Sequence, residues 1–466
     1  MPYLLGADMG TTSLKMTLSD EQGNLIRETT KPYNLETRGD WVEMDAEEYF
    51  RIFSSAFDEI SAGCEIEALS IDTQCETLIV ADKNGLPLRK AIVWLDNRAV
   101  DEAYEIEKEF GVKTIYEITG QTEVAAAWPA CKLLWLKRNE PEVFSKIDKV
   151  FLLSDYLLFR LTSEYVTERT VQSSSLYLDI RSGIWWQAML NYIGIDIAIL
   201  PKIINTAETV GFYGRTRVVM GVMDQISGAI GAGVTGHRRI SEMTGTAMVV
   251  LSPTNTIPPY NPDCKVPCHI NYDGTYCLLP WIPTAGMALK WFVENFCEGF
   301  DFKKLDALAE EIPNGCCGLT FLPYQCGSIF PKYNPTASGV FAGLTLEHNR
   351  AHFYRAVLEA VAFSLKRMLD SLDPETEEIR AVGGGALSPL WCQIKADTTG
   401  KRLVTLKHKE TACLGSVIIA GVGAGLFPGV ETACERLIKT DTIYTPSGVD
   451  YTGAFQKFCE WENKCI

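Results

Sequence analysis

Residues 3–18 read YLLGADMGTTSLKMTL, and this stretch decides the fold. An apolar run at its start leads to Asp8 and to the small residues GTT at 10–12, after which apolar residues recur at 14, 16 and 18. Alternating apolar and polar side chains are typical of a half-buried β-strand, and Gly beside polar residues is typical of a tight turn. We therefore predict a strand, a tight turn and a second strand.

The same pattern returns near the middle of the chain. Residues 240–251 read ISEMTGTAMVVL, with Gly245-Thr246 as the turn, and Gly245 lies 235 residues after Gly10. A repeat of half the chain indicates two similar domains and not a solenoid. The small-residue segment GAIGAG at 228–233 precedes the second copy. We therefore place the boundary near residue 237, between domains of residues 1–237 and 238–466.

Strand and helix patterns alternate in both halves. Runs at 66–70 and 149–153 predict strands, whereas apolar residues spaced three and four apart predict helices at 132–138 and 349–370. Such alternation is typical of layered α/β proteins. The sequence therefore predicts an α/β fold.

The composition excludes several classes of protein. The 466 residues carry 43 basic and 59 acidic side chains, and the net charge of −16 repels nucleic acids and anionic membranes. The apolar segment at 414–427 is too short and too rich in Gly to span a bilayer, and the N-terminus lacks a signal-peptide pattern. The 15 cysteines include no CxxC pair, which favours reduced thiols. We expect a cytoplasmic protein without nucleic-acid or membrane partners.

Three glycine-containing segments are candidates for phosphate binding. Asp8 ends a predicted strand beside the GTT turn, where backbone N–H groups can face phosphate oxygens and the carboxylate can face Mg²⁺ through water. The Gly245-Thr246 turn repeats this arrangement, and the pair indicates a phosphate clamp. The third segment, AVGGGA at 381–386, precedes a predicted helix at 390–399 and lets a flat base or a phosphate approach the backbone. Taken singly, each is also compatible with an ordinary turn.

Two further regions carry a resemblance to a known family. The stretch GVFAGL at 339–344, followed by His352-Phe353 and AVLE at 356–359, fits the C-terminal signature of the FGGY carbohydrate kinases. Residues 129–139 fit the N-terminal signature more loosely, and Ala127 departs from it. The chain resembles this family over essentially its whole length. The resemblance implies two actin-like (ribonuclease H-like) ATPase domains flanking a catalytic cleft, with ATP and Mg²⁺ as cofactors.

The resemblance also implies roles for individual residues. Asp224, in GVMDQ at 221–225, is similar to the family's catalytic base, and Gln225 to a residue beside the sugar. On the residues alone, the alternative for Asp224 is a helix N-cap, which Asp also favours. Asp8 is similar to the metal-binding residue. The positions that contact ATP in the family correspond here to Thr11, Thr12, Lys15, Thr244, Gly245, Thr246, Gly286, Lys290, Gly384, Gly385, Ala386 and Ser388.

The substrate side matches no single subfamily. The segment QCET at 74–77 stands where xylulokinases read QMHG and glycerol kinases read QRET. Ala127 stands where glycerol kinases have a tyrosine, so the resemblance implies room for a substrate longer than three carbons. The residues implied in substrate binding are Gln74, Cys75, Glu76, Trp94, Asp96, Asp224 and Gln225.

We therefore expect an ATP-dependent kinase for a small sugar or polyol, most similar to xylulokinases that phosphorylate a pentulose. Alternative substrates are erythritol, glycerol, gluconate and ribulose. A non-catalytic actin-like nucleotide switch is an alternative from another class, but a switch needs no polyol pocket. A homodimer is left open as the assembly.

Overall fold

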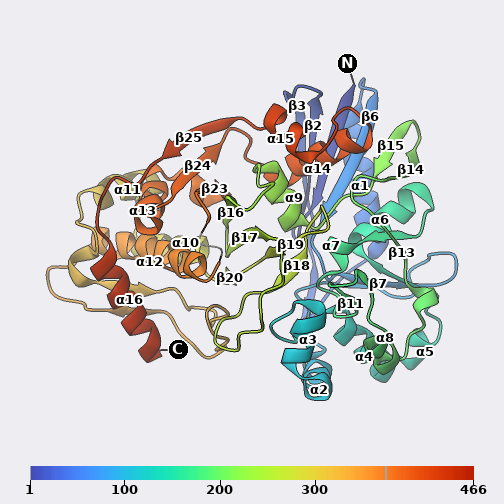
Figure 1. The fold of residues 1–466 in the computed structure, drawn as a ribbon, viewed down its shortest axis with the longest axis horizontal. Helices are drawn as coiled ribbons and strands as arrows, with labels where there is room; N and C mark the ends of the chain where they lie inside the picture. Colours follow the sequence, from blue (N-terminus) through green and yellow to red (C-terminus); the bar gives the residue numbers. More distant parts are fainter. Residues whose placement is uncertain (1, 373–374, 466) are drawn as a thin grey trace.

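The chain folds into two α/β halves that lie side by side (Figure 1). The computed structural model describes residues 2–372 and 375–465. In the first half, β1 (Tyr3–Met9) forms a hairpin with β2 (Ser13–Asp20); in the second, β16 (Arg239–Thr244) forms one with β17 (Met248–Thr254). Both hairpins predicted from the Gly-Thr turns are thus confirmed.

The central sheets of the two halves share one arrangement of strands. Strand β1 pairs antiparallel with β2 and parallel with β6 (Ile66–Thr73). Likewise, β16 pairs antiparallel with β17 and parallel with β23 (Glu378–Val382). The repeat seen in the sequence is therefore a repeat of topology. The other strands are β3 (Leu25–Pro32), β15 (Thr216–Val219) and β14 (Thr209–Tyr213) in the first sheet, and β18 (Cys268–Ile270), β19 (Tyr276–Leu278), β20 (Trp281–Ile282), β24 (Arg402–Leu406) and β25 (Thr440–Tyr444) in the second.

Smaller sheets complete the strand content of the described residues. A five-stranded sheet of the first half contains β4 (Glu36–Arg38), β5 (Trp41–Met44), β8 (Ala91–Ile92), β7 (Leu78–Ala81) and β9 (Lys149–Leu152) in that order. The two-stranded sheets pair β10 (Val166–Glu168) with β13 (Lys202–Ile204), β11 (Leu178–Asp179) with β12 (Ile184–Trp185), and β21 (Thr320–Leu322) with β22 (Val340–Ala342). The strand predicted at 149–153 is confirmed as β9.

The predicted helices are present as well. Helix α12 (Arg350–Asp370) begins after Asn349, whose side chain accepts a hydrogen bond from the Ala351 N–H, as expected of an N-cap. Helices α4 (Pro129–Asn139) and α13 (Pro389–Thr399) confirm the other two predictions. The remaining helices are α1 (Ala46–Ser61), α2 (Val100–Phe110), α3 (Val112–Thr119), α5 (Pro141–Phe144), α6 (Leu153–Thr162), α7 (Arg169–Gln172), α8 (Gln187–Ile193), α9 (Asp224–Gly231), α10 (Gly286–Phe296), α11 (Phe302–Glu310), α14 (Thr411–Gly423), α15 (Val430–Leu437) and α16 (Thr452–Cys465).

Helix α14 connects the two halves, because in the chain it lies between β24 and β25 of the second sheet but packs on β1 and β6 of the first and on α9 (Figure 1). Two glycines permit this close approach. A Cβ atom on Gly6 would lie 2.0 Å from the Cys413 carbonyl oxygen, and one on Gly415 would lie 1.9 Å from that of Ser227. Residues beyond the predicted boundary at 237 therefore take part in the packing of the first half, and the boundary itself stays a prediction.

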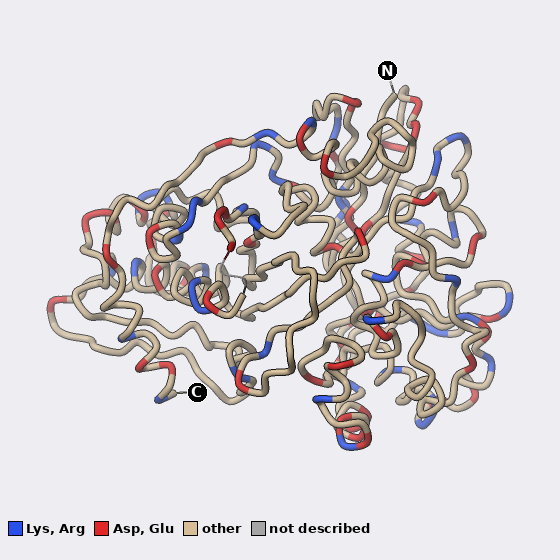
Figure 2. Tube along the Cα trace, in the orientation of Figure 1, with Lys and Arg blue, Asp and Glu red and all other residues tan. Residues whose placement is uncertain are grey.

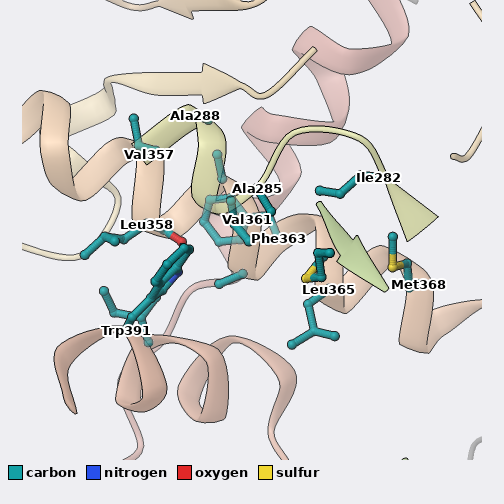
Figure 3. Packing of buried hydrophobic residues seen from close by; sticks show 14 of the residues in the cluster. Ile282, Ala285, Ala288, Val357, Leu358, Val361, Phe363, Leu365, Met368 and Trp391 are labelled. Atoms are coloured by element: carbon teal, nitrogen blue, oxygen red, sulfur yellow. The ribbon is translucent and has the colours of Figure 1, made fainter. Parts of the chain in front are cut away.

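A hydrophobic cluster in the second half packs residues of several helices against one another (Figure 3). It includes Ala285 at the start of α10, Leu358 and Val361 of α12, and Trp391 of α13. The Trp391 indole N–H donates to the Leu358 carbonyl oxygen at 3.0 Å, which ties α13 to α12. The packing of α10, α12 and α13 therefore fixes the positions of the loops that precede α10 and α13.

Charged residues of both signs are spread over both halves (Figure 2). Residues 1–237 carry 35 acidic and 22 basic side chains, against 24 and 21 in residues 238–466, so most of the net charge of −16 belongs to the first half. In the described ranges, no helix has the length and apolar content needed to cross a membrane.

Candidate active site

Three carboxyl groups meet where the first sheet faces α9. Asp8 near the end of β1 is in register with Asp72 near the end of β6. The next residue, Thr73, forms a parallel bridge with Met223, which places Asp224 directly beyond the strand ends. Met223 is the N-cap residue of α9, and Asp224 is its first helical residue. The helix N-cap considered for Asp224 is therefore taken by Met223.

Burial and mutual repulsion raise the pKa values of these carboxyl groups. Burial, with the charges of Asp8 and Glu76, raises the pKa of Asp224 to about 8, although the Gln225 N–H donates to its Oδ1 at 2.6 Å. Burial also raises the pKa of Asp8 to about 6, against the lowering effect of Lys15. Carboxyl groups perturbed in this way are typical of sites that transfer protons or bind cations. Asp224 is thus suited to accept a proton near neutral pH.

The turn after β1 lies beside the residues predicted to contact the substrate. The Gly10 N–H donates to the Ser13 carbonyl oxygen at 3.1 Å and closes the turn. The Trp94 indole N–H donates to the Thr11 hydroxyl at 2.9 Å. The structure therefore brings together Thr11, a predicted ATP contact, and Trp94, a predicted substrate contact. On the adjoining strand, the Lys15 ammonium group lies 2.5 Å from Glu410.

The segment at 74–77 forms a strained turn. Glu76 has φ of 61°, in the left-handed region that disfavours residues with a side chain. The Lys132 ammonium group holds this turn by donating to the carbonyl oxygens of Glu76, at 2.8 Å, and Val93, at 3.0 Å. Burial raises the pKa of Glu76 to about 7. Lys132, which matches the family signature, thus acts as a scaffold for a predicted substrate contact.

The other predicted substrate contacts differ in how they are held. The Gln74 side-chain amide donates to the Tyr49 hydroxyl at 3.3 Å, and its Oε1 is buried without a hydrogen-bond partner. Cys75 is buried. Asp96 is fully buried and binds Arg98 through two contacts of 2.7 and 2.8 Å. Its carboxylate also accepts from the Val42 N–H at 2.6 Å. Asp96 therefore stabilises its own segment, and its predicted contact with substrate stays a prediction.

A cavity of about 970 Å³ opens in the second half, next to the Gly245-Thr246 turn. This volume suits a ligand as large as a nucleotide. Gly286 packs directly on the turn, since a Cβ atom there would lie 2.3 Å from the Gly245 carbonyl oxygen. Ala386 does not line this cavity, and Thr11, Thr12 and Lys15 belong to the opposite half. The predicted ATP contacts that line it are Thr244, Gly245, Thr246, Gly286, Lys290, Gly384, Gly385 and Ser388.

Three acidic residues near the site were not predicted from the sequence. Asp72 had a signal, because a carboxylate inside an apolar strand two residues before a predicted substrate contact is unusual. Glu410 and Asp306 had none, since both lie far from every motif. Asp306 lines the nucleotide-sized cavity and accepts hydrogen bonds from the hydroxyls of Tyr354 and Ser388, each at 2.8 Å.

The carboxyl groups fit a magnesium ion bound jointly with phosphates. Asp72 Oδ1 is buried without a hydrogen-bond partner, beside Asp8, so an acceptor oxygen is left over. Mg²⁺ prefers such oxygens and is usually held by one or two carboxylates together with phosphates and water. Over the described residues, no group of three or more side chains could hold a metal ion by itself. The fit is therefore to a metal carried in with a nucleotide.

Comparisons with known proteins agree with this geometry. The model for the N-terminal domain of the FGGY family of carbohydrate kinases matches residues 3–235, and that for the C-terminal domain matches residues 265–424. The chain belongs to the FGGY family of carbohydrate kinases. This confirms the resemblance found in the sequence, and it makes the protein an enzyme that uses ATP as its phosphate donor.

Several FGGY kinases are similar to this chain throughout its length. The xylulose kinase of Lactococcus lactis is 30% identical, over 94% of this chain and 91% of its own. The ligand-bound xylulose kinase structure from Lactobacillus acidophilus has a TM-score of 0.92 at 26% identity and covers 100% of this chain and 98% of its own. The gluconate kinase structure from the same organism has a TM-score of 0.91 at 25% identity, over 99% and 98%. The expected actin-like ATPase fold is thus confirmed.

Proposed function

We propose that this FGGY kinase transfers the γ-phosphate of MgATP to a hydroxyl group of a neutral ketopentose, with xylulose as the leading candidate. The names of the two xylulose kinases reported above support this substrate class. The observation that carries the proposal is the position of Asp224 between the two sides of the site. Asp224 is close enough to both Asp8, on the phosphate side, and Glu76, on the sugar side, for their charges to raise its pKa.

The chemistry follows from this position. Asp224 accepts the proton of the sugar hydroxyl while the hydroxyl oxygen forms its bond to the γ-phosphorus. The bond between the γ-phosphorus and the bridging oxygen breaks, and ADP leaves. Asp8 and Asp72 would hold Mg²⁺, which would neutralise charge on the phosphates. The Gly10-Thr11 and Gly245-Thr246 turns hold the phosphates from opposite halves through N–H and hydroxyl groups.

The charge of the sugar side favours a neutral substrate over gluconate. Asp224 and Glu76 are acidic, and each in its ionised form would repel a substrate carboxylate. The ammonium group of Lys132 lies beside Glu76 but donates to backbone carbonyl oxygens. A carboxylate entering here would lose its hydration without gaining a free cationic partner. For this reason gluconate is not the leading candidate. The similarity to a gluconate kinase nevertheless makes it a substrate to test.

A coupled assay of ADP release tests the proposal. Purified enzyme is given MgATP with xylulose, ribulose, erythritol, glycerol or gluconate, and with no acceptor as the control. We expect kcat/KM to be highest for a ketopentose and ATP hydrolysis without acceptor to be slow. The highest kcat/KM for gluconate would overturn the assigned substrate class. ADP release that no acceptor increases would overturn the transfer of phosphate to a sugar.

A further inference from the structure

A fully buried ion pair lies directly below the Gly245-Thr246 turn. The Lys395 ammonium group of α13 lies 2.9 and 3.0 Å from the two carboxylate oxygens of Glu242 on β16. Both side chains have an exposed fraction of 0%. Because water cannot solvate either group, each charge is stabilised mainly by the other.

The hydroxyl group of Thr244 completes this pair. Lys395 donates to Thr244 Oγ1 at 3.0 Å, and the Thr244 hydroxyl donates in turn to Glu242 Oε1. Thr244 lies at the end of β16, next to Gly245, and it lines the nucleotide-sized cavity. Glu242 and Lys395 do not line that cavity. Any effect of these two residues on the cavity is therefore transmitted through the residues that they contact.

Two more residues that line the cavity, Gly385 and Trp391, contact Lys395 of the same pair. A Cβ atom on Gly385 would lie 2.6 Å from Thr244 Cβ and 3.2 Å from Lys395 Nζ, so the glycine loop sits against both side chains. The Lys395 ammonium group also lies 4.7 Å from the ring centre of Trp391, which lines the cavity. The ion pair thus contacts Thr244 beside the turn and Gly385 in the glycine loop, and Lys395 also contacts Trp391 of its own helix. All three of these residues line the cavity.

Stability alone does not account for such a pair. The loss of hydration on burial is large, and two apolar side chains of similar volume often stabilise a fold as well or better. What apolar side chains cannot do is fix the rotamer of a buried threonine by hydrogen bonds to its hydroxyl. We propose that Glu242 and Lys395 are positioning residues that hold Thr244, and with it the Gly245-Thr246 turn, against the Gly384-Gly385 loop in the geometry that binds ATP. This inference rests on the proposed function, which places ATP in this cavity.

The test separates positioning from stability. Glu242→Gln and Lys395→Met each leave a buried charge without its partner, so both should lower the melting temperature strongly. The double variant Glu242→Met/Lys395→Met removes both charges at similar volume and should recover most of that loss. We expect the double variant to raise KM for ATP roughly tenfold, the scale of one lost hydrogen bond, with KM for the sugar unchanged.

Thr244→Val tests the same contact while keeping both charged side chains of the ion pair. It replaces the hydroxyl group, which is hydrogen-bonded to both of them, by a methyl group, and it should raise KM for ATP by a similar factor. Because both changes act on one contact, the triple variant should show no further increase over the double variant. Thr244→Val also keeps the test decisive if the double variant fails to fold. In that case, an unchanged KM for ATP in Thr244→Val would overturn the inference.

A second buried ion pair provides the matched control. Arg355 Nε lies 2.9 Å from Glu359 Oε1 on α12, and neither residue lines the nucleotide-sized cavity. Arg355→Met/Glu359→Met should change the melting temperature but not KM for ATP. If the Glu242/Lys395 double variant also keeps the wild-type KM for ATP, or if the control raises it as much, the inference is wrong. Failure of wild-type enzyme to bind ATP would overturn the proposed function and the inference together, whereas wild-type binding with unshifted variants overturns the inference alone.

Discussion

Ser416 on α14 donates a hydrogen bond of 2.6 Å to Asp72 on β6, and both side chains are fully buried. The bond joins a helix that lies between two strands of the second sheet in the chain to the carboxyl cluster of the first half. Because removal of one partner leaves a buried acceptor unsatisfied, Ser416→Ala should lower the free energy of unfolding by about 1–3 kcal/mol. Urea unfolding measures this loss. Thr399→Ala, which removes a half-buried hydroxyl at the end of α13, is a control with a smaller expected effect, and an equal loss in both would contradict a special role for Ser416.

The pH dependence of activity should follow Asp224. Burial raises its pKa from the ordinary 3.8 to about 8 in the folded protein, and a general base acts only when deprotonated. The kcat/KM for the sugar should therefore increase with pH up to about 8 and then level off. Initial rates at fixed, saturating MgATP between pH 5 and 9 measure this. A constant kcat/KM across that range would contradict the role of Asp224.

The same shift makes a prediction for stability. Between pH 4 and 8 the folded protein keeps the Asp224 proton that the unfolded chain has lost, so the contribution of Asp224 to the free energy of unfolding should fall as pH rises through this range. Asp224→Asn removes this titration. The variant should gain stability relative to wild type as pH rises from 4 to 8, as measured by melting temperature. The same pH dependence in both proteins would show that Asp224 does not titrate as assigned.

The parts of the structure that could be predicted from the sequence are those set by neighbouring residues. The two hairpins, α12 and the helix after the glycine loop follow from local apolar spacing and turn residues. The contacts of the site do not, because they join distant positions. The Asp8 and Asp72 pair depends on strand register, and the Glu242 and Lys395 pair joins residues 153 apart. Asp96 illustrates the limit, because the family resemblance implied a substrate contact and gave no sign that Arg98 and the Val42 N–H occupy its carboxylate.

Asp8 should matter for the metal and the nucleotide more than for the sugar. Asp8→Ala removes a carboxylate assigned to Mg²⁺ and phosphate, so it should raise the Mg²⁺ concentration needed for half-maximal activity at least roughly tenfold. Calorimetry should give a sugar affinity within a factor of about three of wild type. Circular dichroism checks the fold. Equal losses of sugar and MgATP affinity would identify Asp8 as a structural residue of the turn.

Ala127 should set the minimum length of the substrate. If its methyl group leaves room that a three-carbon substrate cannot fill, kcat/KM for the best four- to six-carbon substrate should exceed that for glycerol at least roughly 10²-fold. Ala127→Tyr should shrink this ratio, whereas Ala127→Ser, a change of similar size, should preserve it. Steady-state rates with a ketopentose, erythritol and glycerol give the ratio. Glycerol as the best substrate of the wild-type enzyme would contradict this account.

The most direct measurement is the amount of sugar phosphate formed for each ADP released, in the wild-type enzyme and in Asp224→Asn. Phosphorus NMR detects both products in one sample of enzyme, MgATP and xylulose. The account predicts one sugar phosphate per ADP in the wild type, and a kcat at least roughly 10²-fold lower in Asp224→Asn with ATP affinity unchanged. Inorganic phosphate in place of sugar phosphate, or near wild-type turnover by a folded Asp224→Asn variant, would contradict it.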